Sequence, residues 1–240
     1  MYAKLIPYFS AIFPVPQHLK TLIRNLFTHP NNATVLDIGF GTGNLLEFLL
    51  QLHIDVYGLE VSSDLIHHVY GRLKIHLDKL KLGSMEEAGV LFAGVAFDLI
   101  TCVGNTLVQA EHKHQKQFIQ ACNLLLRPNG RLIIGLLNYN RILDQKITEL
   151  PPIERELKSQ PIIFHRNYEF NQDGTLTFKT QLLQDGESVH ADSTVLYPTR
   201  REQVEEWLRE EGFVVEVYGG YDKSEWKDSS FYTVFVCRKA

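Results

Sequence analysis

Two patterns of apolar residues alternate along the chain, and together they predict an α/β fold. Short runs of aliphatic and β-branched residues are typical of strands buried on both faces of a parallel sheet. Between them lie stretches in which apolar residues recur three and four positions apart, as in amphipathic helices. This order predicts a doubly wound, Rossmann-like sheet with helices on both faces. The expected strands are 34–38, 55–60, 80–82, 97–103, 131–137, 213–218 and 231–238, and the expected helices are 19–27, 45–50, 65–73, 112–127 and 199–211.

The segment 144–198 departs from this order. Pro151-Pro152 lie near its start, where we expect them to break the chain. Polar and apolar residues then alternate between Asp-Gly turns, a pattern typical of antiparallel strands with one exposed face. We therefore predict an antiparallel β lobe inserted after the fifth strand of the sheet. Its expected strands are 162–170, 175–184 and 188–197.

Length and composition fit one domain that binds a small partner. The 240 residues are 45% hydrophobic, which is enough for a core of ordinary size. A net charge of −4 and a pI near 6.2 give no electrostatic footprint for nucleic acid or an acidic membrane. The three cysteines are far apart and lack metal-ligand spacing, so we expect reduced thiols in the cytoplasm. We find neither an apolar run of transmembrane length nor a signal-peptide pattern.

A glycine-rich loop follows the first expected strand. Gly39, Gly41 and Gly43 are spaced G-x-G-x-G. The dinucleotide fingerprint G-x-G-x-x-G would place its third glycine at Asn44. Glycine allows positive φ and a close approach of a ligand to the backbone. Asp37, at the end of the strand, would repel a pyrophosphate and attract a cationic group. The loop therefore favours a ligand with a positive charge over a dinucleotide.

A second acidic residue ends the next expected strand. Glu60 lies 19 residues beyond Gly41, close to the spacing of about 20 at which a carboxylate accepts hydrogen bonds from ribose hydroxyls. With Val61 beside it, Glu60 fits the ribose of a dinucleotide or of an adenosyl sulfonium. A solvated acid at the end of a strand is the alternative.

Three stretches resemble the class I S-adenosylmethionine-dependent methyltransferases. Asp37-Ile-Gly-Phe-Gly-Thr-Gly43 resembles motif I of that family. Val103-Gly-Asn-Thr-Leu107 and Asn138-Tyr-Asn-Arg-Ile-Leu143 resemble the small-molecule N-methyltransferases of the glycine and sarcosine kind. The resemblance implies S-adenosylmethionine as cofactor and a single methyltransferase domain over residues 1–240. It also implies a seven-stranded sheet with an antiparallel last strand. The resemblance covers most of residues 33–143 and 199–238.

The family's donor site implies roles for residues after the third and fourth strands. Ser84 stands where an acid commonly accepts a hydrogen bond from the adenine amino group, and it also suits an ordinary turn. Met85 offers a soft apolar surface for the purine ring. The fourth strand leads into the methyl-donor site, which implies contacts from Val103, Gly104 and Asn105. A turn or helix cap is the other interpretation of Asn105.

The acceptor is expected to contact residues near the N-terminus and after the fifth strand. In the glycine methyltransferase group the asparagine after this strand faces the acceptor, which implies that role for Asn138, with Tyr139 beside it. Tyr8 belongs to an aromatic segment, residues 1–30, that we expect to include a lid over the ligand. Apolar packing across the sheet edge is the alternative for this segment.

The β lobe, residues 144–198, stands where small-molecule methyltransferases often carry an acceptor lid. Arg166 is a candidate to bind an acceptor carboxylate, and a surface or structural ion pair is the alternative. Because successive side chains of a strand point to opposite faces, we expect His165 to face away from Arg166 and Tyr168. His165 or a tyrosine would accept a proton if the nucleophile needs a base.

We therefore predict an enzyme that transfers a methyl group from S-adenosylmethionine to a small molecule, most simply an amine. Positioning and exclusion of water would be its main tasks, because the sulfonium is intrinsically reactive. An NAD-dependent oxidoreductase would share the sheet and Glu60, but Asn44 disfavours it. A protein that binds the nucleoside without catalysis is the second alternative. His112 and His114 have no further ligands nearby, so no metal site is expected.

Overall fold

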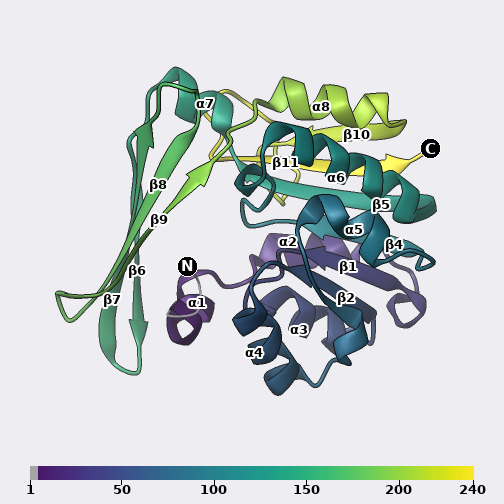
Figure 1. Ribbon diagram of the computed structural model, residues 1–240, viewed down its shortest axis with the longest axis horizontal. Coiled ribbons are helices and arrows are strands. Elements are labelled where there is room, and N and C mark those ends of the chain that lie inside the picture. Colours follow the sequence, from purple (N-terminus) through teal and green to yellow (C-terminus); the bar gives the residue numbers. More distant parts are fainter. Residues whose placement is uncertain (1–4) are drawn as a thin grey trace.

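A seven-stranded sheet forms the larger body of the protein, which the computed structural model describes for residues 5–240 (Figure 1). Its strands follow the order β10-β11-β5-β4-β1-β2-β3. The strands from β3 to β5 pair in parallel, whereas β11 runs antiparallel to both β5 and β10. This confirms the predicted α/β sheet with an antiparallel last strand. The strands are β1 Thr34–Ile38, β2 Asp55–Glu60, β3 Leu80–Leu82, β4 Phe97–Cys102, β5 Leu126–Leu137, β10 Phe213–Tyr218 and β11 Tyr232–Lys239.

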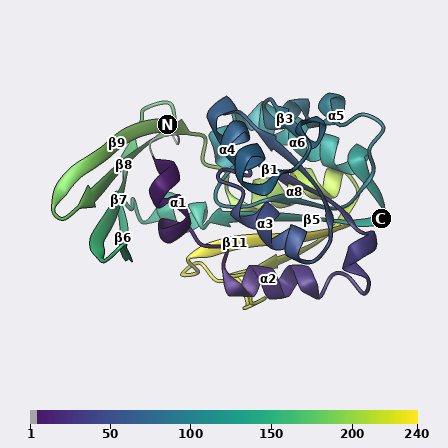
Figure 2. The same ribbon diagram turned by 90° about the horizontal axis from the view of Figure 1, so that it is seen from below.

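Helices cover both faces of this sheet (Figure 2). Side chains of α2, α3 and α4 share one core cluster with Val35 of β1, and those of α5, α6 and α8 share the other with Leu36. Neighbouring strand residues thus enter opposite cores, which explains the continuous apolar runs in the sequence. Within residues 5–240 we find no helix whose length and apolar character would let it cross a membrane. The helices are α2 Gln17–Arg24, α3 Asn44–Gln51, α4 Ser63–Leu73, α5 Ala88–Leu91, α6 His112–Leu125 and α8 Arg201–Glu210.

A separate four-stranded antiparallel sheet extends from the larger body, and we call it the lobe (Figure 1). It follows helix α7, Tyr139–Asp144, and confirms the predicted inserted β lobe. Its strands lie in sequence order, so β6 and β9 are its edges. The strands are β6 Glu149–Leu157, β7 Gln160–Phe170, β8 Leu176–Gln184 and β9 Glu187–Leu196.

Two segments that contain proline lie inside irregular strands. Pro151-Pro152 lie inside β6, where the pairing register with β7 shifts between Leu150 and Ile153. The predicted break is wrong because an edge strand can tolerate residues without an N–H group. Likewise, β5 begins before the expected stretch 131–137 and includes Pro128-Asn-Gly130, next to a register shift in its pairing with β4.

The first helix, α1 Ile6–Ile12, lies between the lobe and the larger body (Figure 2). Leu5 and Ile12 share a core cluster with Ile162, Phe164 and Leu182 of the lobe. The start of the chain therefore packs mainly on the lobe, rather than across the edge of the large sheet. Residues 1–4 of the expected N-terminal segment lie outside the described residues.

Candidate active site

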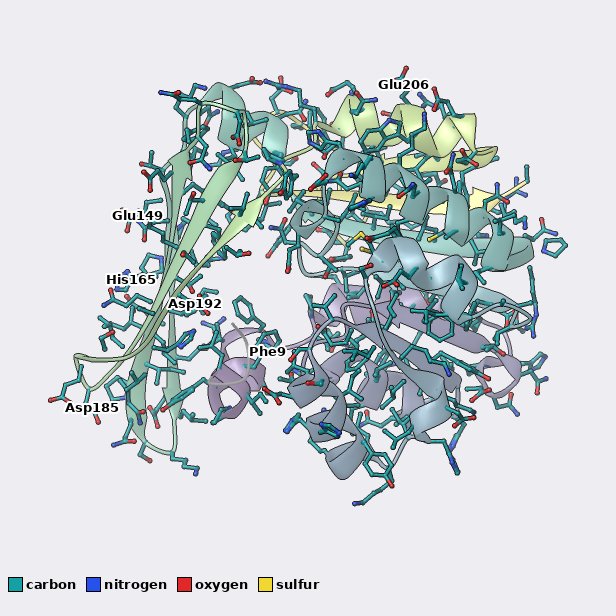
Figure 3. The ribbon with its side chains drawn as sticks, viewed as in Figure 1. Phe9, Glu149, His165, Asp185, Asp192 and Glu206 are labelled. Atoms are coloured by element: carbon teal, nitrogen blue, oxygen red, sulfur yellow. The ribbon has the colours of Figure 1, made fainter. Side chains whose placement is uncertain are left out.

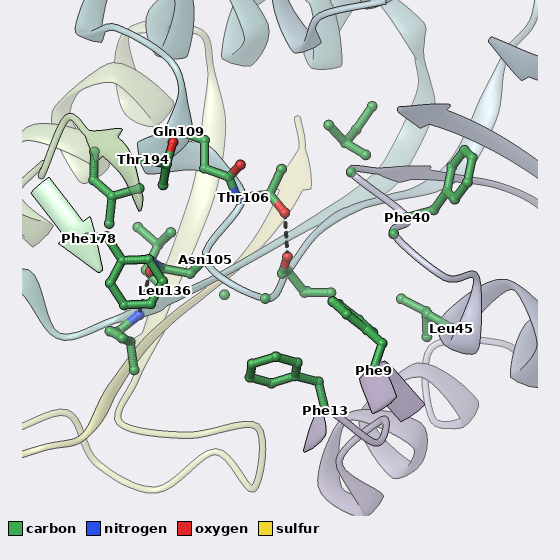
Figure 4. Close-up of a pocket in the computed structure, with 18 of the residues that line it drawn as sticks. Phe9, Phe13, Phe40, Leu45, Asn105, Thr106, Gln109, Leu136, Phe178 and Thr194 are labelled. Carbon is green, nitrogen blue, oxygen red and sulfur yellow. Dashed lines mark hydrogen bonds between the residues drawn. The ribbon is translucent and has the colours of Figure 1, made fainter. Parts of the chain in front are cut away.

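A cavity of about 1030 Å³ opens between the carboxyl ends of the large sheet, helix α1 and the inner face of the lobe (Figure 4). Ligand pockets commonly measure about 300–1,000 Å³. The cavity therefore has room for a nucleoside and a second small molecule. Its lining is mainly apolar, with polar groups at a few positions. Residues labelled in Figure 4 include Phe9, Phe13, Phe40, Leu45, Leu136 and Phe178, together with Asn105, Thr106, Gln109 and Thr194.

The glycine loop between β1 and α3 forms one end of the cavity. Gly39, Gly41 and Gly43 have φ values of +66°, +56° and +77°. A Cβ at Gly39 would lie 2.5 Å from Thr106 Cγ2, too close for any side chain. Gly41 faces Phe9 of α1, whose ring carbon would lie 3.5 Å from a Cβ placed there. The loop thus exposes bare backbone beneath an aromatic cover, as a close-fitting ligand requires.

Asp37 lies at the end of β1 and is only 2% exposed. Its Oδ1 accepts a hydrogen bond of 2.7 Å from Thr101 Oγ1 on β4. Burial raises the pKa of Asp37 to about 7; the bond from Thr101 partly opposes this rise, and the Glu60 charge adds to it. A bound cation would favour the ionised form of this carboxyl group. Asp37 is therefore poised to change charge near neutral pH.

Glu60 ends β2 with its carboxylate held by three backbone amides. Its Oε2 accepts from Gly41 N at 3.1 Å, and its Oε1 accepts from Val61 N at 2.8 Å and Ser62 N at 3.1 Å. Burial raises the pKa of Glu60, whereas the three amide bonds lower it in part. A carboxylate offers about four acceptor sites, so capacity remains for a ligand hydroxyl. Val61 lines the cavity beside it.

Ser84 and Met85 line the cavity beyond β3. Both the backbone N–H and the hydroxyl of Ser84 donate to Glu87 Oε2 at 2.8 Å, which caps the 3₁₀ helix Met85–Glu87. The hydroxyl oxygen keeps its own acceptor capacity, so the two interpretations of Ser84 are compatible. Met85 is buried and contributes its thioether to the wall.

The turn after β4 has an unusual backbone. Gly104 and Asn105 both have a φ of +71°, and asparagine tolerates this left-handed conformation better than most residues. Asn105 Nδ2 donates to Tyr139 Oη at 2.7 Å, and its Oδ1 accepts from Leu137 N at 3.2 Å. The Asn105 amide therefore ties the ends of β4 and β5 together. Val103, Gly104 and Asn105 all line the cavity.

Asn138 and Tyr139 lie outside the cavity lining, which corrects their predicted position beside the acceptor. The Asn138 side chain caps α7, and its Nδ2 donates to the carbonyls of Asp228 and Ser230 at 3.1 Å each. Tyr139 is 2% exposed and belongs to the main core. Because the chain turns into α7 directly after β5, both side chains point into the protein.

Helix α1 places Phe9, and not Tyr8, in the cavity. Tyr8 Oη donates to Gln184 Oε1 on β8 at 2.8 Å, so Tyr8 holds α1 to the lobe rather than contacting an acceptor. Phe9 points into the space between the lobe and the larger body (Figure 3). On the glycine-loop side, Ser10 Oγ donates to Asn44 Oδ1 at 2.9 Å. The helix thus covers the cavity and bridges its two sides.

Arg166 reaches the cavity from β7. Its Nη2 donates to Pro151 O at 2.8 Å, whereas its buried Nε has no hydrogen-bond partner among residues 5–240. Burial lowers the pKa of Arg166, and the phenols of Tyr168 and Tyr232 partly oppose this effect. His165 lies on the opposite face of the lobe, as predicted (Figure 3).

Sequence reasoning missed several cavity residues, among them Phe178, Thr180 and Tyr221. Thr180 and Phe178 lie on β8, and Thr180 is the cross-strand partner of Arg166. Tyr221 belongs to the connection between β10 and β11. Its one signal in the sequence is Gly135, a glycine inside an apolar strand, which often marks a close approach. A Cβ at Gly135 would lie 1.9 Å from the Tyr221 hydroxyl oxygen.

Comparison with known proteins supports the resemblance found in the sequence. Residues 35–130 match the model of a family described as a methyltransferase domain. The ubiquinone biosynthesis O-methyltransferase of Xanthomonas axonopodis pv. citri is 30% identical over 115 residues, which are 45% of this chain and 45% of that protein. The Haemophilus ducreyi protein of the same name is 26% identical over 127 residues, 50% of each chain. The chain thus spans about half the length of the curated relatives it matches.

Solved methyltransferase structures share the whole fold. The CcbJ methyltransferase from Streptomyces caelestis has a TM-score of 0.79 at 18% identity, covering 100% of this chain and 96% of that one. CalS10 from Micromonospora echinaspora is an amino pentose methyltransferase solved with S-adenosylmethionine bound. It has a TM-score of 0.73 at 18% identity, covering 93% of this chain and 90% of that one. These likenesses show the fold, lobe included. The family match over residues 35–130, together with this fold, indicates a methyltransferase.

Proposed function

We propose that this protein is an enzyme that transfers a methyl group from S-adenosylmethionine to a small-molecule amine that also carries a carboxylate. The observation that carries the proposal is the division of charge in the cavity. Asp37 and Glu60 lie on the sheet side, and Arg166 lies on the lobe side. The family match over residues 35–130 includes both acidic residues and the glycine loop between them.

The residues on the sheet side fit the donor. Glu60 keeps acceptor capacity for ribose hydroxyls, and Asp37 would attract the ammonium or sulfonium group. Met85 would pack on the adenine ring, with Ser84 accepting from its amino group. The pyrophosphate of NAD would meet the same two carboxylates, which disfavours a dinucleotide. The proposed donor site comprises Asp37, Gly39, Gly41, Gly43, Glu60, Val61, Ser84, Met85, Val103, Gly104 and Asn105.

S-adenosylmethionine, when bound, would supply an electrophilic methyl group: the amine lone pair would form the new bond to carbon as the C–S electron pair passes to sulfur, and the methylated ammonium would lose its proton to solvent after release. The residues of this chain would position the two molecules and exclude water from them. Phe9 and the rest of α1 cover the glycine loop, and the lobe closes the opposite side. These positions support the proposed lid roles of α1 and of the lobe. Proton transfer by a side chain is not required, and His165 lies outside the cavity.

The lobe side would select the acceptor. Arg166 has an unmet donor at Nε, and a carboxylate could accept from it in a charge-assisted hydrogen bond. Thr180 adds a neighbouring hydroxyl, and Phe178 adds an apolar surface. The amine agrees with the sequence resemblance to glycine and sarcosine N-methyltransferases and with the description of CalS10 as an amino pentose methyltransferase. The curated relatives are named O-methyltransferases, so a hydroxyl acceptor is the second candidate.

Calorimetric titration of the purified protein with S-adenosylmethionine, S-adenosylhomocysteine and NAD tests the donor. We expect saturable one-to-one binding of the two adenosyl compounds and no heat from NAD. Glu60→Gln is the matched variant, because it keeps the shape of the side chain and removes its charge. This variant should bind both adenosyl compounds more weakly. Binding of NAD alone would refute the proposal, and binding of none would favour a different ligand.

Screening for methyl transfer then tests the acceptor. Pairs of amines that differ only in a carboxylate are incubated with methyl-labelled S-adenosylmethionine, and the labelled products are counted. We expect transfer to the carboxylate-bearing member of each pair. Transfer to phenols or alcohols instead would favour the second candidate. A protein that binds the donor but labels no member of either set would be a binding protein without this activity.

A further inference from the structure

The loop between β10 and β11 is held firmly under the cavity. Gly219 N donates to Ser224 O at 2.8 Å, and within this segment Lys223 N donates to Gly220 O at 3.1 Å and closes a tight turn. At its far end, Asn138 Nδ2 donates to the carbonyls of Asp228 and Ser230 at 3.1 Å each. Asn138, which the sequence resemblance assigned to the acceptor, therefore fixes this loop instead. The loop carries one cavity residue from its N-terminal turn, Tyr221.

The Tyr221 hydroxyl occupies a notch in the central strand β5. A Cβ at position 135 would lie only 1.9 Å from the Tyr221 oxygen, so the hydroxyl fits because Gly135 has no side chain. A glycine inside a strand often marks such a close approach of another group. The nearby Gly104 backbone partly lowers the pKa of this hydroxyl.

Tyr221 stands where the two sides of the cavity meet. Burial raises the pKa of Tyr221 well above its usual value, and the charges of Tyr232 and Asp37 act in the same direction. Asp37 belongs to the donor side, and the Tyr232 ring lies 6.2 Å from the Tyr221 ring and near Arg166. A phenol with a raised pKa stays neutral and takes no proton from the acceptor. Its oxygen can accept hydrogen bonds through its lone pairs, and Tyr221 lines the cavity.

We propose that the Tyr221 oxygen contacts the cationic, methyl-bearing end of the donor, at the junction of the donor and acceptor sites. The inference rests on the proposed function. Phenol oxygens accept weak hydrogen bonds from polarised C–H groups, and they accept much stronger ones from an ammonium group. The contact would orient the methyl group toward the lobe side without any proton transfer. Tyr221 would thus distinguish a donor that still carries its methyl group from the product that has lost it.

The test compares three ligands that differ only at this end. S-adenosylmethionine carries the methyl sulfonium, sinefungin carries an amine in its place, and S-adenosylhomocysteine carries neither. Tyr221→Phe removes only the hydroxyl. Calorimetry should show about a threefold loss of affinity for S-adenosylmethionine and about a tenfold or greater loss for sinefungin. The affinity for S-adenosylhomocysteine should change by less than about twofold.

Tyr218→Phe is the matched control, because Tyr218 precedes the same loop but lies outside the cavity lining. It should leave all three affinities unchanged. Gly135→Ala provides a second variant, since the added Cβ displaces the hydroxyl without removing it. It should reproduce the selective loss of sinefungin affinity.

A spectroscopic measurement reads the contact directly. In the complex with S-adenosylmethionine labelled with ¹³C at the methyl carbon, the methyl proton resonance of the wild-type protein should lie downfield of its position in Tyr221→Phe. An equal loss of affinity for all three ligands would overturn the inference while leaving the proposed function intact. So would the absence of any change in affinity or in the resonance. Failure of the wild-type protein to bind any of the three would overturn the proposed function itself, and this inference with it.

Discussion

The two sides of the cavity treat their charged groups in opposite ways. On the sheet side, Glu60 accepts hydrogen bonds from three backbone amides and Asp37 accepts one from Thr101. On the lobe side, Arg166 keeps a buried Nε that meets no partner within residues 5–240. Buried polar groups are normally satisfied, so a ligand is expected to complete the lobe side. Under the proposed function, the donor half would be organised before binding, whereas the acceptor would complete the acceptor half.

Helix α1 joins these unlike halves. Leu5 and Ile12 pack on the lobe, while Ser10 and Phe9 reach Asn44 and Gly41 of the glycine loop. Asn44 Nδ2 also donates to Phe13 O at 3.4 Å. Asn44 takes the place of a third fingerprint glycine, and its side chain anchors the cover of the donor site. Asparagine at position 44, which disfavours a dinucleotide, therefore also helps to hold α1 over the cavity.

The largest effect is expected from Asp37→Asn, which removes the buried charge of the donor half. A hydrogen bond to a charged group contributes about 1.5–3 kcal/mol, so the dissociation constant of S-adenosylmethionine should rise about 10- to 100-fold. Calorimetry measures the change, and circular dichroism verifies the fold. Unchanged donor affinity in a folded variant would contradict the assignment of Asp37.

The same residue should couple pH to stability and to affinity with opposite signs. The pKa of Asp37 is raised from 3.8 to about 7, so between these values the folded state binds more protons than the unfolded state. The free energy of unfolding should therefore fall as pH rises from about 4 to 7. Donor affinity should increase as pH passes about 7, because only the carboxylate attracts a cation. Urea unfolding and calorimetry at pH 5, 6, 7 and 8 measure both, and Asp37→Asn should flatten both curves.

A smaller and more selective effect is expected from Arg166→Gln on the lobe side. The KM of carboxylate-bearing acceptors should rise about tenfold or more, since a charge-assisted bond is lost, while donor affinity stays the same. Stability should hold or increase, because an unpaired buried charge disappears. Lys179→Gln is the control, since Lys179 pairs with Glu169 outside the cavity. Equal effects on acceptors with and without a carboxylate would contradict the role of Arg166.

Asn138→Ala should act on stability rather than on acceptor selection. It removes a helix cap and the hydrogen bonds that hold the β10–β11 loop. A loss of about 1–3 kcal/mol follows from such changes, and it corresponds to a fall in melting temperature of several degrees for a protein of this size. Differential scanning calorimetry measures it, with the exposed Gln117→Ala as control. A variant of unchanged stability and raised acceptor KM would instead restore the role predicted from the sequence.

The smallest effect is expected from Tyr8→Phe. The change removes one hydrogen bond of 2.8 Å between α1 and the lobe, which contributes about 0.5–1.5 kcal/mol. Melting temperature should fall slightly, and the KM of the acceptor should not change. A selective loss of acceptor affinity at unchanged stability would return Tyr8 to the acceptor site.

The fold could be predicted because each strand of the large sheet has a recognisable pattern in its own short segment of sequence. Buried parallel strands have continuous apolar runs, and the glycine loop and helix starts separate them. The missed strand, β6, contains Pro151-Pro152, and only its place at the edge of the lobe makes those residues acceptable. Sequence patterns specify a strand well, but they do not say which strands will be edges.

That the proposed donor residues lie together could also be predicted from the sequence, because Asp37, Glu60 and the glycines lie at the ends of strands that the pattern locates. Parallel strands bring their carboxyl ends to one edge of the sheet, so adjacent strands place these residues together. The acceptor residues were predicted less well. Tyr8 and Phe9 are neighbours on one helix, and only the packing of that helix on the lobe decides which of them enters the cavity.

The sequence by itself thus determined the sheet, the lobe and the grouping of the proposed donor residues, since these depend on spacing within short segments. Tertiary structure alone decided the acceptor half. Asn138 points into the protein, where its amide hydrogen-bonds to the loop near Asp228. Tyr221 enters the cavity because β11 returns antiparallel to β5 beside Gly135. These contacts join residues more than eighty positions apart, and their geometry follows from the packing of whole elements rather than from any local pattern.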